Sequence, residues 1–153
     1  MSAMLSTGSA AQLWQGLLSQ AQARVHARLP EDQESYLVFT LLRHCRDGLL
    51  PGRTMALELL DGLGQPGRLR CDRLRDVGDR CLLLAGLFPG QATRRLVGTD
   101  YFPALGRSAY GELGAVRGDP LAGLYRQLAL AFDALVRVLA GLRGSPGGGS
   151  WTA

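Results

Sequence analysis

Residues 68–88, RLRCDRLRDVGDRCLLLAGLF, carry a helical pattern in the middle of the chain. Apolar side chains recur there at steps of three and four, which places them on one side of an α-helix: Leu74, Val77, Cys81, Leu84 and Phe88. From Cys81 onward the segment is apolar on every side. Because a helix of that kind is normally buried, we predict that residues 81–88 lie at the centre of the fold.

Helical spacing and start signals mark the segments on either side. Asp119-Pro120 predicts the start of the last helix, because Asp is a favoured N-cap and Pro suits the first helical position. No alternation of apolar and polar residues competes with the helical pattern. We therefore predict an all-α fold, an irregular bundle of five or six helices. The predicted helices are residues 9–29, 30–47, 55–63, 68–88, a helix capped by Thr99 or Asp100, and residues 119–143.

The chain of 153 residues is the size of one domain. We expect a flexible N-terminus over residues 1–8 and a single helical domain over residues 9–143. Residues 144–153, GSPGGGSWTA, have the composition of a flexible linker. We predict that this tail is disordered.

The composition narrows the class of protein and its compartment. Every basic residue is Arg, and the chain has no Lys, Ile or Asn, a skew that GC-rich codons favour and that suggests a bacterial source. No apolar stretch reaches the roughly 20 residues that a membrane span needs, and the start lacks a secretory signal. The three cysteines form no CxxC pair, which favours free thiols. We expect a cytoplasmic protein.

Residues that could bind a metal ion are few and scattered. They are His26, His44, Cys45, Cys71 and Cys81. Metal sites on helices usually place ligands three or four residues apart on one face, and neither histidine has such a partner. We therefore predict neither a metal site nor a cofactor.

The Arg-rich segment over residues 68–80 could bind a phosphate backbone. However, acidic residues interrupt it at a spacing of four, where ion pairs form within a helix. We expect the pairs Arg68–Asp72, Arg75–Asp79 and Asp76–Arg80. A solvated face with internal ion pairs is the preferred interpretation, and nucleic-acid binding is the alternative.

The segment from Thr99 to Leu113 is unusual because it combines tyrosines with small residues. Several glycines in a helix cost free energy, about 1 kcal/mol each relative to Ala. Close approach of a neighbouring helix or of a ligand would offset that cost. The segment is therefore either a tightly packed core helix or one side of a pocket. For the pocket, the candidate residues for binding a ligand or a partner are Asp79, Tyr101, Arg107 and Tyr110.

Parts of the chain resemble an uncharacterised family of small all-helical bacterial proteins. The resemblance rests on residues 74–89, 94–101 and 105–110, with 34–42 as an earlier helix. It matches a Gly-Asp helix that ends in Gly-Phe-Phe, followed by a helix with Tyr-Tyr, Gly and Ala-Tyr. Here Leu87 stands at an aromatic position and Tyr101-Phe102 replaces Tyr-Tyr. The resemblance implies one helical domain and points to Asp79, Tyr101, Gly106 and Tyr110 without assigning roles, because the family brings no established activity with it.

The absence of a catalytic motif gives the leading functional hypothesis. We expect a helical protein-interaction or regulatory protein without catalytic activity, which forms a homodimer and binds an unidentified protein partner. The first alternative is a small-molecule-binding domain or enzyme with a pocket near Tyr101 and Tyr110. The second alternative is nucleic-acid binding through the Arg-rich helix.

Overall fold

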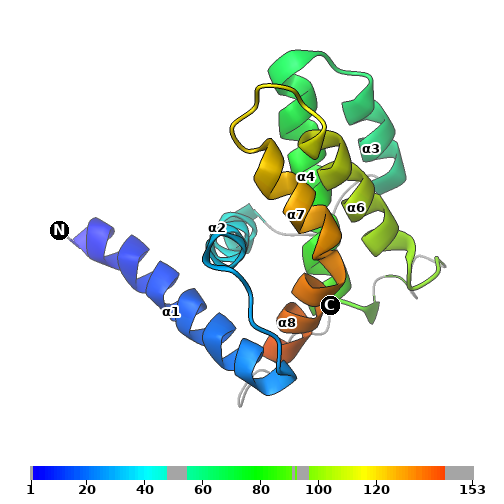
Figure 1. The fold of residues 1–153 in the computed structure, drawn as a ribbon. Coiled ribbons are helices and arrows are strands. Elements are labelled where there is room, and N and C mark those ends of the chain that lie inside the picture. Colours follow the sequence, from blue (N-terminus) through cyan, green and yellow to red (C-terminus); the bar gives the residue numbers. More distant parts are fainter. Residues whose placement is uncertain (1, 48–54, 91, 93–96, 144–153) are drawn as a thin grey trace.

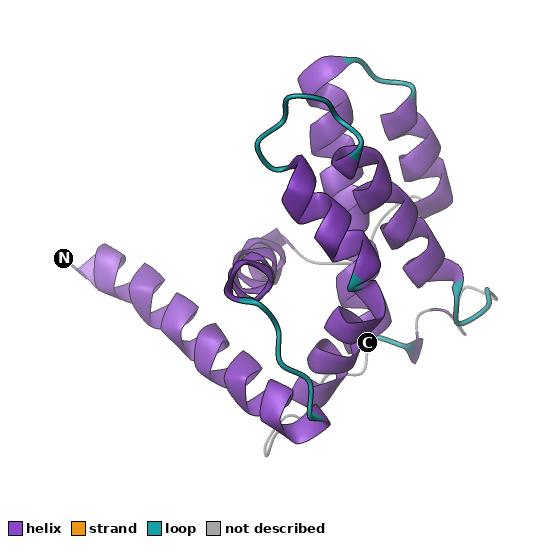
Figure 2. Cartoon of the chain, viewed as in Figure 1, coloured by secondary structure: helices purple, strands orange, loops and turns teal. Residues whose placement is uncertain are grey.

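The computed structural model describes residues 2–47, 55–90, 92 and 97–143. All regular structure in these residues is helical, with no strand (Figure 2), so the predicted all-α class is confirmed. The predicted count of five or six is too low, because these residues form seven helices. They are α1 (Ser2–Val25), α2 (Glu31–Asp47), α3 (Met55–Leu63), α4 (Gly67–Leu87), α6 (Tyr101–Gly114), α7 (Ala122–Leu130) and α8 (Phe132–Arg143).

Helix α4 is the centre of the fold, as its apolar second half predicts. It packs against α3, α6 and α8. Four consecutive side chains are at most 1% exposed, which confirms that this half is covered on every side: Cys81, Leu82, Leu83 and Leu84.

Glycines let the helices around α4 approach closely. A Cβ atom on Gly106 of α6 would lie 2.4 Å from Cζ of Phe132, the first residue of α8. A Cβ atom on Gly86 of α4 would lie 2.5 Å from Cβ of Leu139. Both distances are shorter than real carbon contacts. The close approach of neighbouring helices therefore offsets the cost of these helical glycines.

The predicted helix over residues 119–143 is interrupted. Asp119 does not cap an α-helix directly; its Oδ1 accepts a hydrogen bond from Leu121 N at 2.8 Å, and α7 begins at Ala122. A turn at Ala131 then separates α7 from α8. Because Leu135 N still donates to Ala131 O at 2.9 Å, the two helices follow each other almost without a connector.

Helix α1 begins before the predicted residue 9 and ends before the predicted residue 29. His26 ends it in the left-handed region, with φ of 57°. His26 N donates to Ala23 O, and Ala27 N donates to Gln22 O at 3.0 Å. This pair of bonds is the Schellman motif, in which glycine usually takes the left-handed position.

Two arginines join the C-terminal ends of α1 and α8. Arg137 of α8 donates to Val25 O at 2.9 Å, and Arg24 of α1 donates in return to Gly141 O. Carbonyls at a helix C-terminus lack partners within the helix and carry partial negative charge, so arginine side chains stabilise them. Each helix therefore caps the other.

Figure 1 shows α1 along one side of the molecule, meeting α8 near the C-terminal end of each, with α2 between α1 and the remaining helices. No helix among the described residues combines the length and apolar character that crossing a membrane requires. The predicted tail over residues 144–153 lies outside the described residues. So do Arg94 and Arg95, which begin the segment 94–101 of the family resemblance.

Candidate functional site

A buried carboxylate on α4 accepts hydrogen bonds from two other helices. Asp79 is 2% exposed. Its Oδ1 atom accepts a bond of 2.6 Å from the hydroxyl of Tyr36 on α2 and one of 2.7 Å from the hydroxyl of Tyr110 on α6. Hydrogen bonds to an ionised acceptor are shorter and stronger than neutral ones. Asp79 therefore connects α2, α4 and α6 at one point.

The residue before Asp79 makes room for one of these tyrosines. A Cβ atom on Gly78 would lie 2.5 Å from Cε1 of Tyr110, whose side chain is fully buried. Only glycine leaves space for the ring at this position. The Gly78-Asp79 pair thus positions Tyr110 in two ways, since the glycine admits the ring and the carboxylate accepts a hydrogen bond from the hydroxyl.

A third tyrosine, Tyr125 of α7, completes an aromatic cluster around the carboxylate. The rings of Tyr36 and Tyr125 meet edge to face with centroids 5.9 Å apart, and those of Tyr36 and Tyr110 do so at 6.1 Å. The rings of Tyr110 and Tyr125 stack at 6.0 Å. Such contacts add about 0.5–1.5 kcal/mol each to the burial of the rings. We call Asp79, Tyr36, Tyr110 and Tyr125 the tyrosine cluster.

Burial sets the protonation of the tyrosine cluster. Burial raises the pKa of Asp79 to about 6, although the hydrogen bonds from Tyr36 and Tyr110 and the charges of Arg43 and Arg75 lower the pKa. Burial, together with the charge of Asp79, raises the pKa of Tyr36 and of Tyr110 far above the usual value. The hydroxyls therefore stay protonated and donate, whereas Asp79 takes up a proton in mildly acidic solution.

The four candidate residues named from the sequence do not meet at one place. Asp79 and Tyr110 are bonded to each other. The hydroxyl of Tyr101 accepts a bond of 3.3 Å from Ala56 N in the first turn of α3, where backbone donors lack helical partners. Arg107 pairs with Asp133 of α8 at 2.9 Å near the surface. Tyr101 and Arg107 thus connect other pairs of helices.

The ion pairs expected along residues 68–80 are found in part. Asp76 and Arg80 lie 3.0 Å apart, as predicted. The predicted pair Arg75–Asp79 is replaced, because Asp79 binds the tyrosines and Arg75 lies 3.9 Å from Asp72. Arg70 and Arg73 reach other helices, where they pair with Glu112 and Asp61.

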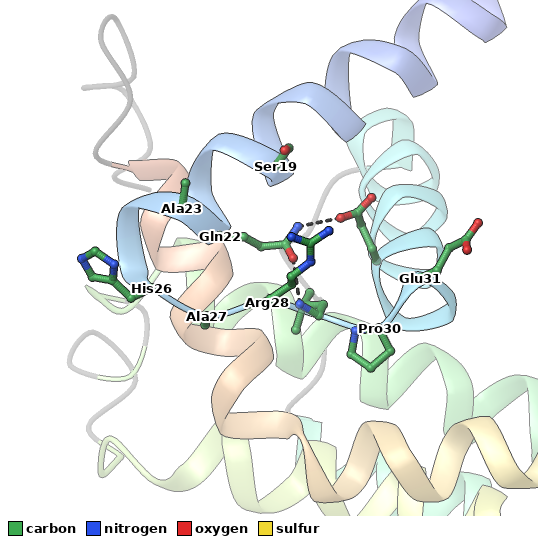
Figure 3. A pocket seen from close by; sticks show the side chains of 10 residues that line it. Ser19, Gln22, Ala23, His26, Ala27, Arg28, Pro30 and Glu31 are labelled. Atoms are coloured by element: carbon green, nitrogen blue, oxygen red, sulfur yellow. Dashed lines mark hydrogen bonds between the residues drawn. The ribbon is translucent and has the colours of Figure 1, made fainter.

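A polar hollow of about 750 Å³ lies elsewhere, at the junction of α1 and α2 (Figure 3). Buried Gln22 holds this junction: its Nε2 donates to Glu34 Oε2 at 2.6 Å, and its Oε1 accepts from Leu29 N at 2.8 Å. His26 and Arg28 also line the hollow. No group of three or more His, Cys, Asp or Glu side chains suited to a metal ion occurs in the described part of the chain.

Comparisons with known proteins add no function to this geometry. No family model, no curated protein and no solved structure matches the chain. The resemblance to the small helical family stays a prediction, and function has to be argued from the residues.

Proposed function

We propose that this chain is a helical interaction or regulatory protein without catalytic activity, which forms a homodimer through the outward face of α3. The supporting observation is that α3 is apolar on both sides. Met55 and Gly62 are buried against the fold, whereas Leu57 and Leu60 on the opposite side are 51% and 65% exposed. An exposed apolar surface on a folded chain is a candidate site for contact with another protein.

A stable dimer interface needs more surface than α3 alone provides. Single exposed leucines are ordinary, but two leucines three positions apart share one face of a helix. A standard interface buries about 800 Å² on each partner, more than one nine-residue helix supplies. We expect the first turn of α4, where Leu69 is 46% exposed, to join α3. A two-fold axis would let this surface pair with its own copy.

The geometry gives less support to the two alternatives. A pocket near Tyr101 and Tyr110 would need both hydroxyls at one space, but one bonds α3 and the other bonds Asp79. Phosphate binding along α4 would need free arginines, but Arg70, Arg73 and Arg80 lie in ion pairs. Specific observations thus favour the interaction role.

Native mass spectrometry and sedimentation of the full chain test the proposal. We expect a dimer for the wild type and a monomer for Leu60→Glu, because a charge at the centre of an apolar interface leaves an unpaired buried group. Leu130→Glu is the matched control, since Leu130 is 80% exposed on α7, and we expect it to remain dimeric. A monomeric wild type, or a Leu60→Glu dimer as stable as the wild type, would contradict the proposal.

A further inference from the structure

The hollow between α1 and α2 is lined by charges of both signs. It is formed by the last two turns of α1, the segment that follows and the first turn of α2, and its volume of about 750 Å³ lies within the range of ligand pockets, about 300–1,000 Å³. Arg28, Glu31 and Glu34 border this space. In Figure 3, the side chain of Arg28 points into the space between the two helices, whereas that of His26 points away from it. The hollow therefore offers a guanidinium group and carboxylates to one bound molecule.

One of these carboxylates is held in place by a buried amide. Gln22 is 8% exposed, and its Nε2 donates to Glu34 Oε2 at 2.6 Å and to Leu18 O at 3.2 Å. Its Oε1 accepts from Leu29 N at 2.8 Å. Because both polar atoms of the amide have partners, Gln22 cannot rotate without breaking one of these bonds, and Glu34 is fixed relative to α1. Among the described residues, no group donates to the other oxygen of Glu34, Oε1. This oxygen is therefore an acceptor that is positioned before any ligand arrives.

The cation of the hollow has no acidic partner in the described part of the chain. Arg28 is exposed and belongs to none of the ion pairs found there, although Glu31 and Glu34 line the same space. A guanidinium group binds a carboxylate through two parallel N–H···O bonds, and a carboxylate accepts from an ammonium group. We propose that this hollow binds a small zwitterion of the amino-acid class, with its carboxylate on Arg28 and its ammonium group on Glu34.

The mixed charges of the lining favour a zwitterion over a ligand with a single charge. An anion on Arg28 would also meet the carboxylates of Glu31 and Glu34, and a cation on Glu34 would also meet Arg28. Like charges brought together lower affinity, so a molecule that carries both charges fits this lining better than either ion alone. The hollow lies away from α3 (Figure 1), and the proposed dimer and this site can therefore fail independently.

Two-dimensional NMR of the isotope-labelled full chain tests the site. The probes are glycine, β-alanine and γ-aminobutyrate, which carry the same two charges at increasing separation. We expect at least one of them to shift backbone amides within residues 19–34 in a saturable way at millimolar concentration, as the few atoms of such probes allow. Acetate and ethylammonium each carry only one of the charges, and we expect each to bind at least about tenfold more weakly than the best probe. The absence of a saturable shift with all three probes would overturn the proposal, and so would acetate or ethylammonium binding as tightly as the best probe.

Two variants assign the contacts to their residues. Arg28→Gln and Glu34→Gln each remove one charge, and Glu34→Gln keeps an oxygen that can accept the bond from Gln22. We expect each to weaken binding of the best probe by about tenfold or more, with amide shifts outside residues 19–34 unchanged because the fold is kept.

Arg117→Gln is the matched control. Arg117 is an exposed arginine in the loop between α6 and α7, which Figure 1 shows at the opposite end of the molecule from the junction of α1 and α2. We expect this variant to bind the probe as the wild type does. Unchanged binding in Arg28→Gln or in Glu34→Gln, or an equal loss in Arg117→Gln, would overturn the proposal.

Discussion

Two contacts around α4 hold their helices by different physical means. Where α6 meets α8, Phe132 fills the slot at Gly106. At Asp79, tyrosine hydroxyls from α2 and α6 reach a buried carboxylate. Close apolar packing is sensitive to side-chain volume and indifferent to pH, whereas a buried ionisable group is sensitive to pH. We call these the glycine-packed contact and the polar contact.

Removing the ring from the glycine-packed contact should have the largest effect. Phe132 is fully buried, and Phe→Ala in a core typically costs about 3–5 kcal/mol. We expect Phe132→Ala to lower the free energy of unfolding by that amount, measured by urea denaturation with circular dichroism. A cost below about 0.5 kcal/mol, the level typical of surface substitutions, would show that the ring does not fill the slot.

The pH dependence of stability isolates the polar contact. Because the folded pKa of Asp79 is raised from 3.8 to about 6, its contribution to stability is full below 3.8 and is lost as pH rises through 6. From pH 4 to pH 7, the unfolding free energy of the wild type relative to Asp79→Asn should therefore fall by about 2–3 kcal/mol. Denaturation curves of both proteins measure this difference. A difference that stays constant or rises with pH would show that folding does not raise the pKa of Asp79.

Volume alone should decide the effect of filling a glycine slot. Gly106→Ala should cost up to about 2 kcal/mol, because overpacking costs about 1–3 kcal/mol and the gain in helix propensity offsets about 1 kcal/mol of it. Gly111 is the matched control on α6, since a Cβ atom there meets nothing within 4 Å. We expect Gly111→Ala to stabilise by up to about 1 kcal/mol. Thermal and urea denaturation of both variants provide the comparison.

A double variant sharpens the same test. In Phe132→Ala the ring that would clash with a Cβ atom on Gly106 is gone, so adding Ala at position 106 should no longer cost stability. The two substitutions should therefore couple favourably by about 2 kcal/mol in a double-mutant cycle. Additive effects would mean that the clash at Gly106 does not involve Phe132.

The apolar pattern predicts the glycine-packed contact better than the polar one. The run from Cys81 to Phe88 shows from sequence alone that α4 is central. The same run also indicates that Asp79 is buried, because Asp79 lies two residues before it on the same helix. Helical spacing instead favours the exposed pair Arg75–Asp79, because local spacing does not show what a neighbouring helix will cover.

Two members of the tyrosine cluster could not be found from spacing. Tyr36 is 43 residues from Asp79 along the chain, and only the packing of α2 on α4 brings them together. Tyr125 lies within the helix predicted over residues 119–143, but that pattern does not reveal the turn at Ala131, since neither Gly nor Pro marks it. The sequence therefore predicts which helices form better than which polar side chains meet.

The smallest predicted effect concerns the C-terminal end of α1. The sequence predicts that end at residue 29, whereas the helix ends at Val25. Glycine is the usual signal of a helix end because it takes the left-handed region without strain, and here His26 occupies that position with φ of 57°. A left-handed residue other than glycine costs about 1 kcal/mol or more. We expect His26→Gly to stabilise the protein by up to about 1 kcal/mol, seen as a higher denaturation midpoint at unchanged slope. Because His26 lies on neither side of α4, the substitution should leave the pH dependence of the polar contact and the coupling at Gly106 unchanged.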